Sequence, residues 1–233
     1  MKTELVSITQ PLNSYLKSHN IPLGLSPEGL TVYIARVSSP RIDKTEKIEG
    51  LLKYCLDNHH WSVFEHITIT AEVVTSIAIA TQILRHRSFC FQQFSQRYAE
   101  VTELEPVELR KQGITNRQSS TEVFNPELEL RENSNAGHTY ILPAKEAIDN
   151  CLRNINKLYE TLIESGVAKE CARMLLPQCT QTTIYMTTNL RNWIHYFAQR
   201  CDDHAQLEHQ EVAYSIRNQM KEYFPIISNV LQW

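Results

Sequence analysis

The sequence predicts an α+β fold in which helices pack against a modest mixed or antiparallel sheet. Two observations support this class: long stretches have helical periodicity, and a few separated strand-like stretches interrupt them. The chain has 233 residues, of which 42% are hydrophobic and 21% charged, so its composition is that of a globular protein able to bury a core. This length fits one large domain or two small ones.

The first predicted elements are a strand and a helix. The stretch "TVYIARV" (31–37) is β-branched and aromatic and has proline and glycine before it, which favours a strand. In "TEKIEGLLKYCLDNHH" (45–60) the apolar residues recur at three- and four-residue spacing, which predicts an amphipathic helix. We expect Asp43 or Thr45 to cap this helix.

A second strand and helix follow. In "HITITAEVV" (66–74) apolar and polar residues alternate, as in a half-buried strand. The stretch "TSIAIATQILRHR" (75–87) has Thr75 or Ser76 as a possible N-cap and one apolar helical face. The basic run Arg85–Arg87 would therefore lie at a helix C-terminus, where the helix dipole favours cations.

The rest of the chain is expected to be mainly helical. Residues from about 102 to 137 carry prolines, glycines and polar runs, so we expect an irregular excursion there. The pattern is helical over 138–176, with a break near "ESG" and an end at Pro177. A strand over 180–189 is predicted next, followed by helices over 190–201 and 205–224, of which the second buries Ala213, Ile216, Met220 and Phe224.

Charge and cysteine content exclude several classes of protein. The 23 Lys and Arg residues stand against 26 Asp and Glu, and the formal net charge of −3 gives no general attraction to nucleic acid or anionic membranes. No apolar run approaches the roughly 20 residues that span a bilayer, and the N-terminus lacks the apolar core of a signal peptide. The six cysteines form no CxxC pair. We therefore expect a cytoplasmic protein in which any anion site is local.

One candidate site is the segment "RHRSFCFQQFSQR" (85–97). Guanidinium groups grip phosphate through paired charged hydrogen bonds, and a nearby hydroxyl adds a neutral donor. Arg85, Arg87, Ser95 and Arg97 have the composition of a phosphate pocket, but a solvated basic helix end explains them equally well. Cys90 lies between Phe89 and Phe91, which favours a buried inert thiol over a nucleophile.

A second candidate site is the segment "TNLRNWIHYFAQRCDDHAQLEH" (188–209). Asn189 is a plausible N-cap, and Arg191 and His195 lie four residues apart on one helical face. Arg200 and His204 repeat that spacing if the helix continues past Asp202. Ion pairs of the arginines with nearby acids are the simple alternative. A metal site built from Asp202, His204, Glu208 and His209 is a weaker one, because no HExxH spacing is present.

The segment "HHWSVFEH" (59–66) places three histidines around one glutamate. Such a group could bind an aromatic cofactor or transfer a proton. Glu65 could equally be a structural partner for His66 or for an arginine.

Several blocks of the sequence, in order, resemble the flavin-dependent thymidylate synthase (ThyX) family. The family signature Arg-His-Arg, seven residues, Ser is matched by Arg85, His86, Arg87 and Ser95. "HHWSVFEH" resembles the family's His-x-Ser/Thr-x-Phe-Glu-His block, and "ARVSS" resembles its early strand. "ARMLLP", "TNLRNWIHYF" and "RCDDHAQLE" also match, so the resemblance covers about residues 35–208. It implies one domain over residues 1–233.

The resemblance implies reductive methylation of dUMP to dTMP. FAD would carry the hydride, NADPH would be the reductant and 5,10-methylenetetrahydrofolate the carbon donor. Arg200 is the implied catalytic residue, since a guanidinium at the uracil edge stabilises an ionised ring. The implied dUMP-binding residues are Gln82, Arg85, Gln93, Ser95, Arg97, Arg173 and Arg200. The implied FAD-binding residues are Ser62, Arg85, His86, Arg87, Gln93, Asn189, Arg191 and His195.

Two positions depart from the family pattern: Gln93 stands where many members have an acid, and His195 where some have asparagine. The resemblance also implies a homotetramer with active sites shared between subunits and no metal, nucleic acid or membrane partner. Two other classes compete. One is a non-catalytic nucleotide- or RNA-binding module that stacks bases on Phe89, Phe91 and Tyr98. The other is a metal-dependent nucleotide hydrolase.

Overall fold

The computed structural model describes residues 1–37, 47–101, 103–114, 119–131 and 137–233. The chain divides into two compact units. Unit 1 comprises Met1–Val74, Ile83–Gln92 and Ile184–Trp233, and unit 2 comprises Thr75–Gln82 and Gln93–Thr183. The predicted α+β class is confirmed, because the described residues form helices and small antiparallel sheets. One domain over residues 1–233 stays a prediction.

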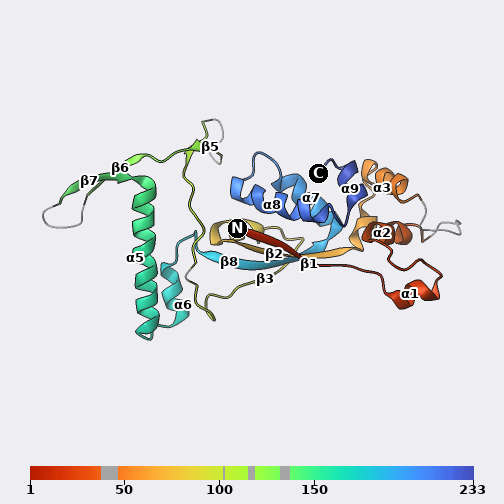
Figure 1. Cartoon of the computed structure of the whole chain (residues 1–233), viewed down its shortest axis with the longest axis horizontal. Coiled ribbons are helices and arrows are strands. Elements are labelled where there is room, and N and C mark those ends of the chain that lie inside the picture. Colours follow the sequence, from red (N-terminus) through yellow and green to blue (C-terminus); the bar gives the residue numbers. More distant parts are fainter. Residues whose placement is uncertain (38–46, 102, 115–118, 132–136) are drawn as a thin grey trace. The chain divides into compact units, whose positions relative to one another are not determined.

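The main sheet has the strand order β1-β2-β8-β3 (Figure 1). Its strands are β1 (Lys2–Ile8), β2 (Thr68–Ser76), β8 (Gln181–Asn189) and β3 (Cys90–Gln93). The alternation predicted for β2 is confirmed, since Ile69, Ala71 and Val73 are fully buried while the residues between them are at least partly exposed. β1 pairs antiparallel with β2, and its N-terminal segment was not predicted as a strand.

Two helices of unit 1 lie along the sheet (Figure 1): α7 (Leu190–Arg200) and α8 (Leu207–Met220). Trp193 and Phe197 of α7 are buried, and the Trp193 indole donates a 3.2 Å hydrogen bond to the Ile69 carbonyl of β2. The predicted burial of Ala213, Ile216, Met220 and Phe224 is also confirmed. These contacts fix α7 to the strand beneath it.

The strand predicted over 31–37 is wrong, because the structure has helix α2 (Pro27–Ala35) there. The Ser26 hydroxyl accepts a 3.1 Å hydrogen bond from the Gly29 amide, and Pro27 occupies the first helical position. A capped helix start of this kind outweighs the weak strand preference of Thr31 and Val32, which are buried on the helix.

The remaining elements of unit 1 are α1 (Asn13–Ser18), α3 (Ile48–Asp57), the short 3₁₀ helix η1 (Trp61–Glu65) and α9 (Pro225–Val230). Helix α3 confirms the helix predicted from the periodicity of 45–60. The expected caps Asp43 and Thr45 lie outside the described residues. Helix α3 follows Lys47, whose φ of 51° is left-handed.

Unit 2 contains α4 (Ile77–Ile83) for most of its length, capped as predicted by Ser76, whose hydroxyl accepts from the Ile79 amide at 3.3 Å. Two antiparallel pairs follow, β4 (Arg110–Gln112) with β5 (Ser120–Val123) and β6 (Glu127–Arg131) with β7 (Thr139–Pro143). The segment expected to be an irregular excursion thus contains β4, β5 and β6. The start of the helical pattern predicted at His138 is wrong, because residues 139–143 pair as β7.

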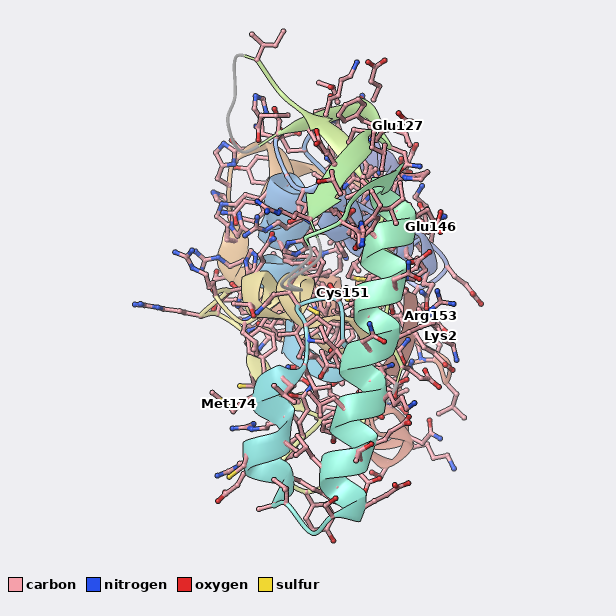
Figure 2. The ribbon with its side chains drawn as sticks, turned by 90° about the vertical axis from the view of Figure 1, so that its left-hand side faces the viewer. Lys2, Glu127, Glu146, Cys151, Arg153 and Met174 are labelled. Atoms are coloured by element: carbon pink, nitrogen blue, oxygen red, sulfur yellow. The ribbon has the colours of Figure 1, made fainter. Side chains whose placement is uncertain are left out.

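The long helix α5 (Ala144–Glu164) follows β7 and ends before Gly166, which has a φ of 85°. Figure 2 shows α5 with α6 (Lys169–Ala172) beside it, and labels Glu146, Cys151 and Arg153 along α5. The 3₁₀ helix η2 (Arg173–Leu175) continues α6 and ends before Pro177. The predicted break near "ESG" is confirmed. None of the helices in the described residues is long and apolar enough to cross a membrane.

Candidate functional site

The basic run Arg85–Arg87 lies at the C-terminal end of α4, as predicted, with Leu84 between them. The turn is closed by a 3.0 Å hydrogen bond from the His86 amide to the Ile83 carbonyl. Arg85 and Arg87 are exposed, and within the described residues neither forms an ion pair. Two unpaired guanidinium groups on one short turn form a site of positive charge, suited to an anionic ligand.

His86 lies between these arginines in sequence and contacts a different partner. The Nε of Arg200 donates a 2.9 Å hydrogen bond to Nε2 of His86. Burial, assisted by the Arg200 charge, lowers the pKa of His86 to about 4, so the ring is neutral at physiological pH. Because Nε2 of the neutral ring accepts the hydrogen bond from Arg200, the ring proton is assigned to Nδ1. Nδ1–H is therefore a hydrogen-bond donor.

Aromatic rings surround this pair inside unit 1. The Tyr196 ring meets His86 edge-on with centroids 4.9 Å apart, and Phe89 and His209 meet it edge-on at 6.1 Å. Tyr196 is buried, and desolvation raises the pKa of its hydroxyl. Burial together with the Arg200 charge lowers the pKa of His209 to about 3. The Arg200 side chain is thus hydrogen-bonded to a neutral, largely buried cluster of His86, Tyr196 and His209.

Helix α7 and η1 carry the other predicted cofactor-binding residues of unit 1. Asn189 is the N-cap, as predicted, and its Oδ1 accepts a 3.1 Å hydrogen bond from the Asn192 amide. Arg191 forms an ion pair with Glu65 of η1, so the alternative that Glu65 is an arginine partner is confirmed. The centroid of the exposed His195 ring lies 4.9 Å from that of the Trp61 ring. The exposed Ser62 follows Trp61 in the sequence.

The remaining predicted nucleotide-binding residues belong to unit 2. Gln93 is half-buried, and its Nε2 donates to the Thr182 hydroxyl at 3.3 Å. Ser95 is exposed at a turn where its carbonyl accepts from the Tyr98 and Ala99 amides. Arg97 is exposed and forms no ion pair within the described part of the chain.

Gln82, at the end of α4, and Arg173, at the start of η2, are the other two predicted residues of unit 2, and both are half-buried. The Nε of Arg173 is buried and lacks a hydrogen-bond partner. A donor left without a partner in this way is costly unless something accepts from it.

The pattern of the sequence did not reveal a cavity in unit 2 next to the start of β8. It has a volume of about 220 Å³ and is lined by Phe94, Glu100, Val101, Glu103, Gln181, Thr182 and Thr183. Lys169 pairs with Glu100 at 3.1 Å, and Gln181 donates to Glu105 at 3.1 Å. The alternation of β8 was the available signal, because it places Thr182 on the buried face, where Gln93 contacts it.

Three interpretations of the sequence are corrected. Helix α7 ends at Arg200, so Arg200 and His204 do not continue one helical face. Cys90, the first residue of β3, is exposed rather than buried, while the preceding Phe89 is buried. The set Asp202, His204, Glu208 and His209 is not brought together: His209 is fully buried and contacts Tyr196, while His204 is exposed and bonds Asp202. In the described residues, no group of three or more potential metal ligands is gathered.

Several known proteins are similar to this chain in sequence or in fold. The sequence profile described as "Thymidylate synthase complementing protein" matches residues 24–226. A "Flavin-dependent thymidylate synthase" of Synechocystis sp. is 43% identical over 209 residues, which are 90% of this chain and 91% of that protein. A "Probable flavin-dependent thymidylate synthase" of Paramecium bursaria Chlorella virus 1 is 39% identical over 235 residues, covering all of both chains.

A solved structure has the same fold. The crystal structure of the UMP/dUMP methylase PolB from Streptomyces cacaoi, bound with 5-Br dUMP, superposes with a TM-score of 0.71 and 23% identity, covering 99% of this chain and 94% of that one. The sequence profile spans all of the predicted site residues, and the two relatives match most or all of the chain. The chain therefore belongs to the family of flavin-dependent thymidylate synthases.

Proposed function

We propose that this enzyme converts dUMP to dTMP by reductive methylation, with FAD as hydride carrier, NADPH as reductant and 5,10-methylenetetrahydrofolate as carbon donor. The observation that carries the proposal is Arg200, a cation whose Nε donates to the neutral acceptor His86, while no hydrogen bond of its terminal nitrogens is found within the described residues. A guanidinium held in this way can stabilise negative charge that develops on a uracil ring.

The donor chemistry of unit 1 fits FAD. Arg85 and Arg87 carry two positive charges without ion-pair partners in the described residues, which matches the two charges of a pyrophosphate. The Nδ1–H of His86 is a donor for a flavin carbonyl or ring nitrogen. Arg191 can still take part, because Glu65 engages its NH1 and a guanidinium has five N–H donors.

Other residues of unit 1 would hold FAD from the α7 side. The tilted rings of Trp61 and His195 offer planar surface for stacking, and Ser62 lies next to Trp61. Asn189 uses its Oδ1 to cap α7, so its amide nitrogen is the group left for the cofactor.

The predicted dUMP residues of unit 2 supply donors suited to a phosphate and a sugar. Arg97, the hydroxyl of Ser95 and the unsatisfied Nε of Arg173 are hydrogen-bond donors, and the first carries a charge that no acid of the described residues neutralises. Gln93 is oriented by Thr182, and a neutral amide there can bind a ligand but cannot act as an acid or base. Gln82 is proposed as a further amide contact.

The chemistry divides between cofactor and chain. Bound FAD supplies hydride transfer. In unit 1, Arg200 would orient the uracil, and in unit 2, Arg97 and Arg173 would bind a phosphate. His86 stays neutral, so it accepts from Arg200 instead of repelling it.

The test is the visible absorption spectrum of the purified protein together with a dTMP assay. We expect a yellow protein that NADPH bleaches, and dTMP formation when dUMP and methylenetetrahydrofolate are added. A colourless protein that cannot be reconstituted with FAD would contradict the proposal. Loss of activity with a chelator would support the hydrolase alternative, and salt-sensitive oligonucleotide binding without flavin would support the RNA-binding one.

In the RNA-binding alternative, bases would stack on Phe89, Phe91 and Tyr98, but these three rings are not all exposed. Phe89 is buried and packs edge-on against Trp193, whereas Tyr98 is 88% exposed. A homotetramer with shared sites and a cytoplasmic location stay predictions. Light scattering on the purified protein measures the subunit number directly.

A further inference from the structure

We infer that Tyr196 and His209 are positioning residues that set the direction of the Arg200 guanidinium through His86. This inference rests on the proposed function, since it assumes that Arg200 faces the uracil. All four side chains lie in unit 1. None of the family blocks quoted above gives Tyr196 or His209 a role.

The first step is the bond between Arg200 and His86. An arginine at the end of a helix has several rotatable bonds, so its head is not fixed by the backbone. Donation from Nε to His86 Nε2 at 2.9 Å holds one edge of the planar guanidinium against the His86 ring and restricts the directions in which its terminal nitrogens can donate. The direction of the head therefore depends on the orientation of the His86 ring.

The second step is the contact between His86 and Tyr196. Tyr196 precedes Arg200 by four residues on α7, so both side chains leave the same helical face. Its ring meets His86 edge-on at 4.9 Å and an interplanar angle of 74°. A buried ring in this position prevents His86 from tilting away from Arg200.

The third step is the bond that holds Tyr196 itself. The Tyr196 hydroxyl and Nε2 of His209 share a 3.1 Å hydrogen bond that joins α7 to α8. His209 is fully buried, and its ring also meets His86 edge-on, at 88°. A polar side chain in the core is costly unless it is paired, so this bond is expected to fix both rings.

The experiment compares Tyr196→Phe and His209→Leu with the wild-type holoenzyme. Both variants keep a buried side chain of related size but lose the hydrogen bond. We expect kcat for dTMP formation, and the release of tritium from C5 of dUMP, to fall by about three- to tenfold, the factor that corresponds to one hydrogen bond. The bound flavin, its absorption spectrum and KM for NADPH should be unchanged.

Two further variants separate positioning from general damage. His209→Gln keeps an amide near the place of Nε2 and should recover most of the kcat that His209→Leu loses. Tyr185→Phe removes a tyrosine hydroxyl elsewhere in unit 1, where it donates to Glu72, and should keep wild-type kcat.

Each outcome decides the question. If the wild-type enzyme forms dTMP and both variants keep its kcat, the positioning role is wrong and the proposed function stands. If all losses of kcat follow losses of FAD or of the melting temperature, and His209→Gln recovers nothing, the pair is merely structural and the inference is wrong. If the wild-type protein binds no flavin and forms no dTMP, the proposed function fails and the inference fails with it.

Discussion

At the scale of single residues, the site depends on cations whose surroundings differ. Arg85, Arg87 and Arg97 are exposed and have no ion pair in the described part of the chain, so they are ready for an anionic ligand. Arg191 already pairs with Glu65, and Arg200 is attached to a neutral histidine. An uncharged acceptor orients a guanidinium and leaves its positive charge in place. A carboxylate partner would largely neutralise that charge. Arg200 is therefore the arginine best suited to act on developing charge.

Replacing Arg200 tests that role. We expect Arg200→Ala to lower kcat for dTMP formation by about 10²-fold or more, the loss typical of removing a donor aimed at transition-state charge. FAD should stay bound, because Arg85, Arg87 and His195, which we propose as FAD-binding residues, are unchanged. Steady-state assays and the flavin spectrum measure both effects. Arg153→Ala, which removes an exposed arginine of α5, is the control and should keep wild-type kcat. Turnover of Arg200→Ala near the wild-type level would exclude the assigned role.

At the scale of elements, helix starts decide structure where periodicity is ambiguous. Helix α2 has a strand-like composition, yet Ser26, Pro27 and the Gly29 amide form a capped helix start. Asn189 caps α7 in the same manner, and this places Arg191 and His195 on the first turns. A local hydrogen bond of this kind satisfies an amide that the helix leaves unpaired.

The N-cap of α2 is expected to contribute measurably to the free energy of unfolding. Ser26→Ala is expected to lower the free energy of unfolding by about 1 kcal/mol, because the Gly29 amide loses its acceptor. Denaturant unfolding followed by circular dichroism measures the change. The matched control is Ser165→Ala, at an exposed serine after α5, which should change stability by less than about 0.5 kcal/mol. Equal effects of the two substitutions would show that the cap is not what stabilises α2.

At the scale of the whole molecule, the buried histidines make stability depend on pH. The pKa of His86 is lowered from 6.5 to about 4, and that of His209 from 6.5 to about 3, in both cases mainly by burial. As pH falls below about 6.5, the unfolded chain binds protons that the folded chain does not. Stability from these two groups is thus complete above that pH and is lost progressively in acid.

His209→Leu should therefore flatten the acid side of the stability profile. Between about pH 7 and pH 5 the melting temperature of the wild-type protein is expected to fall more steeply than that of the variant, because the variant lacks one of the two protons taken up on unfolding. Scanning calorimetry at one protein concentration measures both slopes. His138→Leu, at an exposed histidine, serves as the control. Parallel slopes in His209→Leu and wild type would contradict the prediction.

The correct predictions and the errors have different physical causes. Strands β2 and β8 and helices α3, α7 and α8 each bury one face, so their apolar periods are visible in the sequence. The stretches 31–37 and 139–143 were assigned wrongly because a cap in one and a pairing with β6 in the other overrode the local pattern. Strand β1 was missed because only its pairing with β2 defines it.

The sequence by itself determined the basic run after α4, the N-cap Asn189 and the resemblance to a family, since these depend on neighbours along the chain. Only the tertiary structure decided the partners of the charged groups. Arg200 meets His86 across 114 positions, and Arg191 meets Glu65 across 126. Local spacing carries no information about such pairs, because helix packing against the sheet brings them together. The tertiary structure also made His209 a buried partner of Tyr196 rather than a metal ligand, since its face of α8 packs into the core.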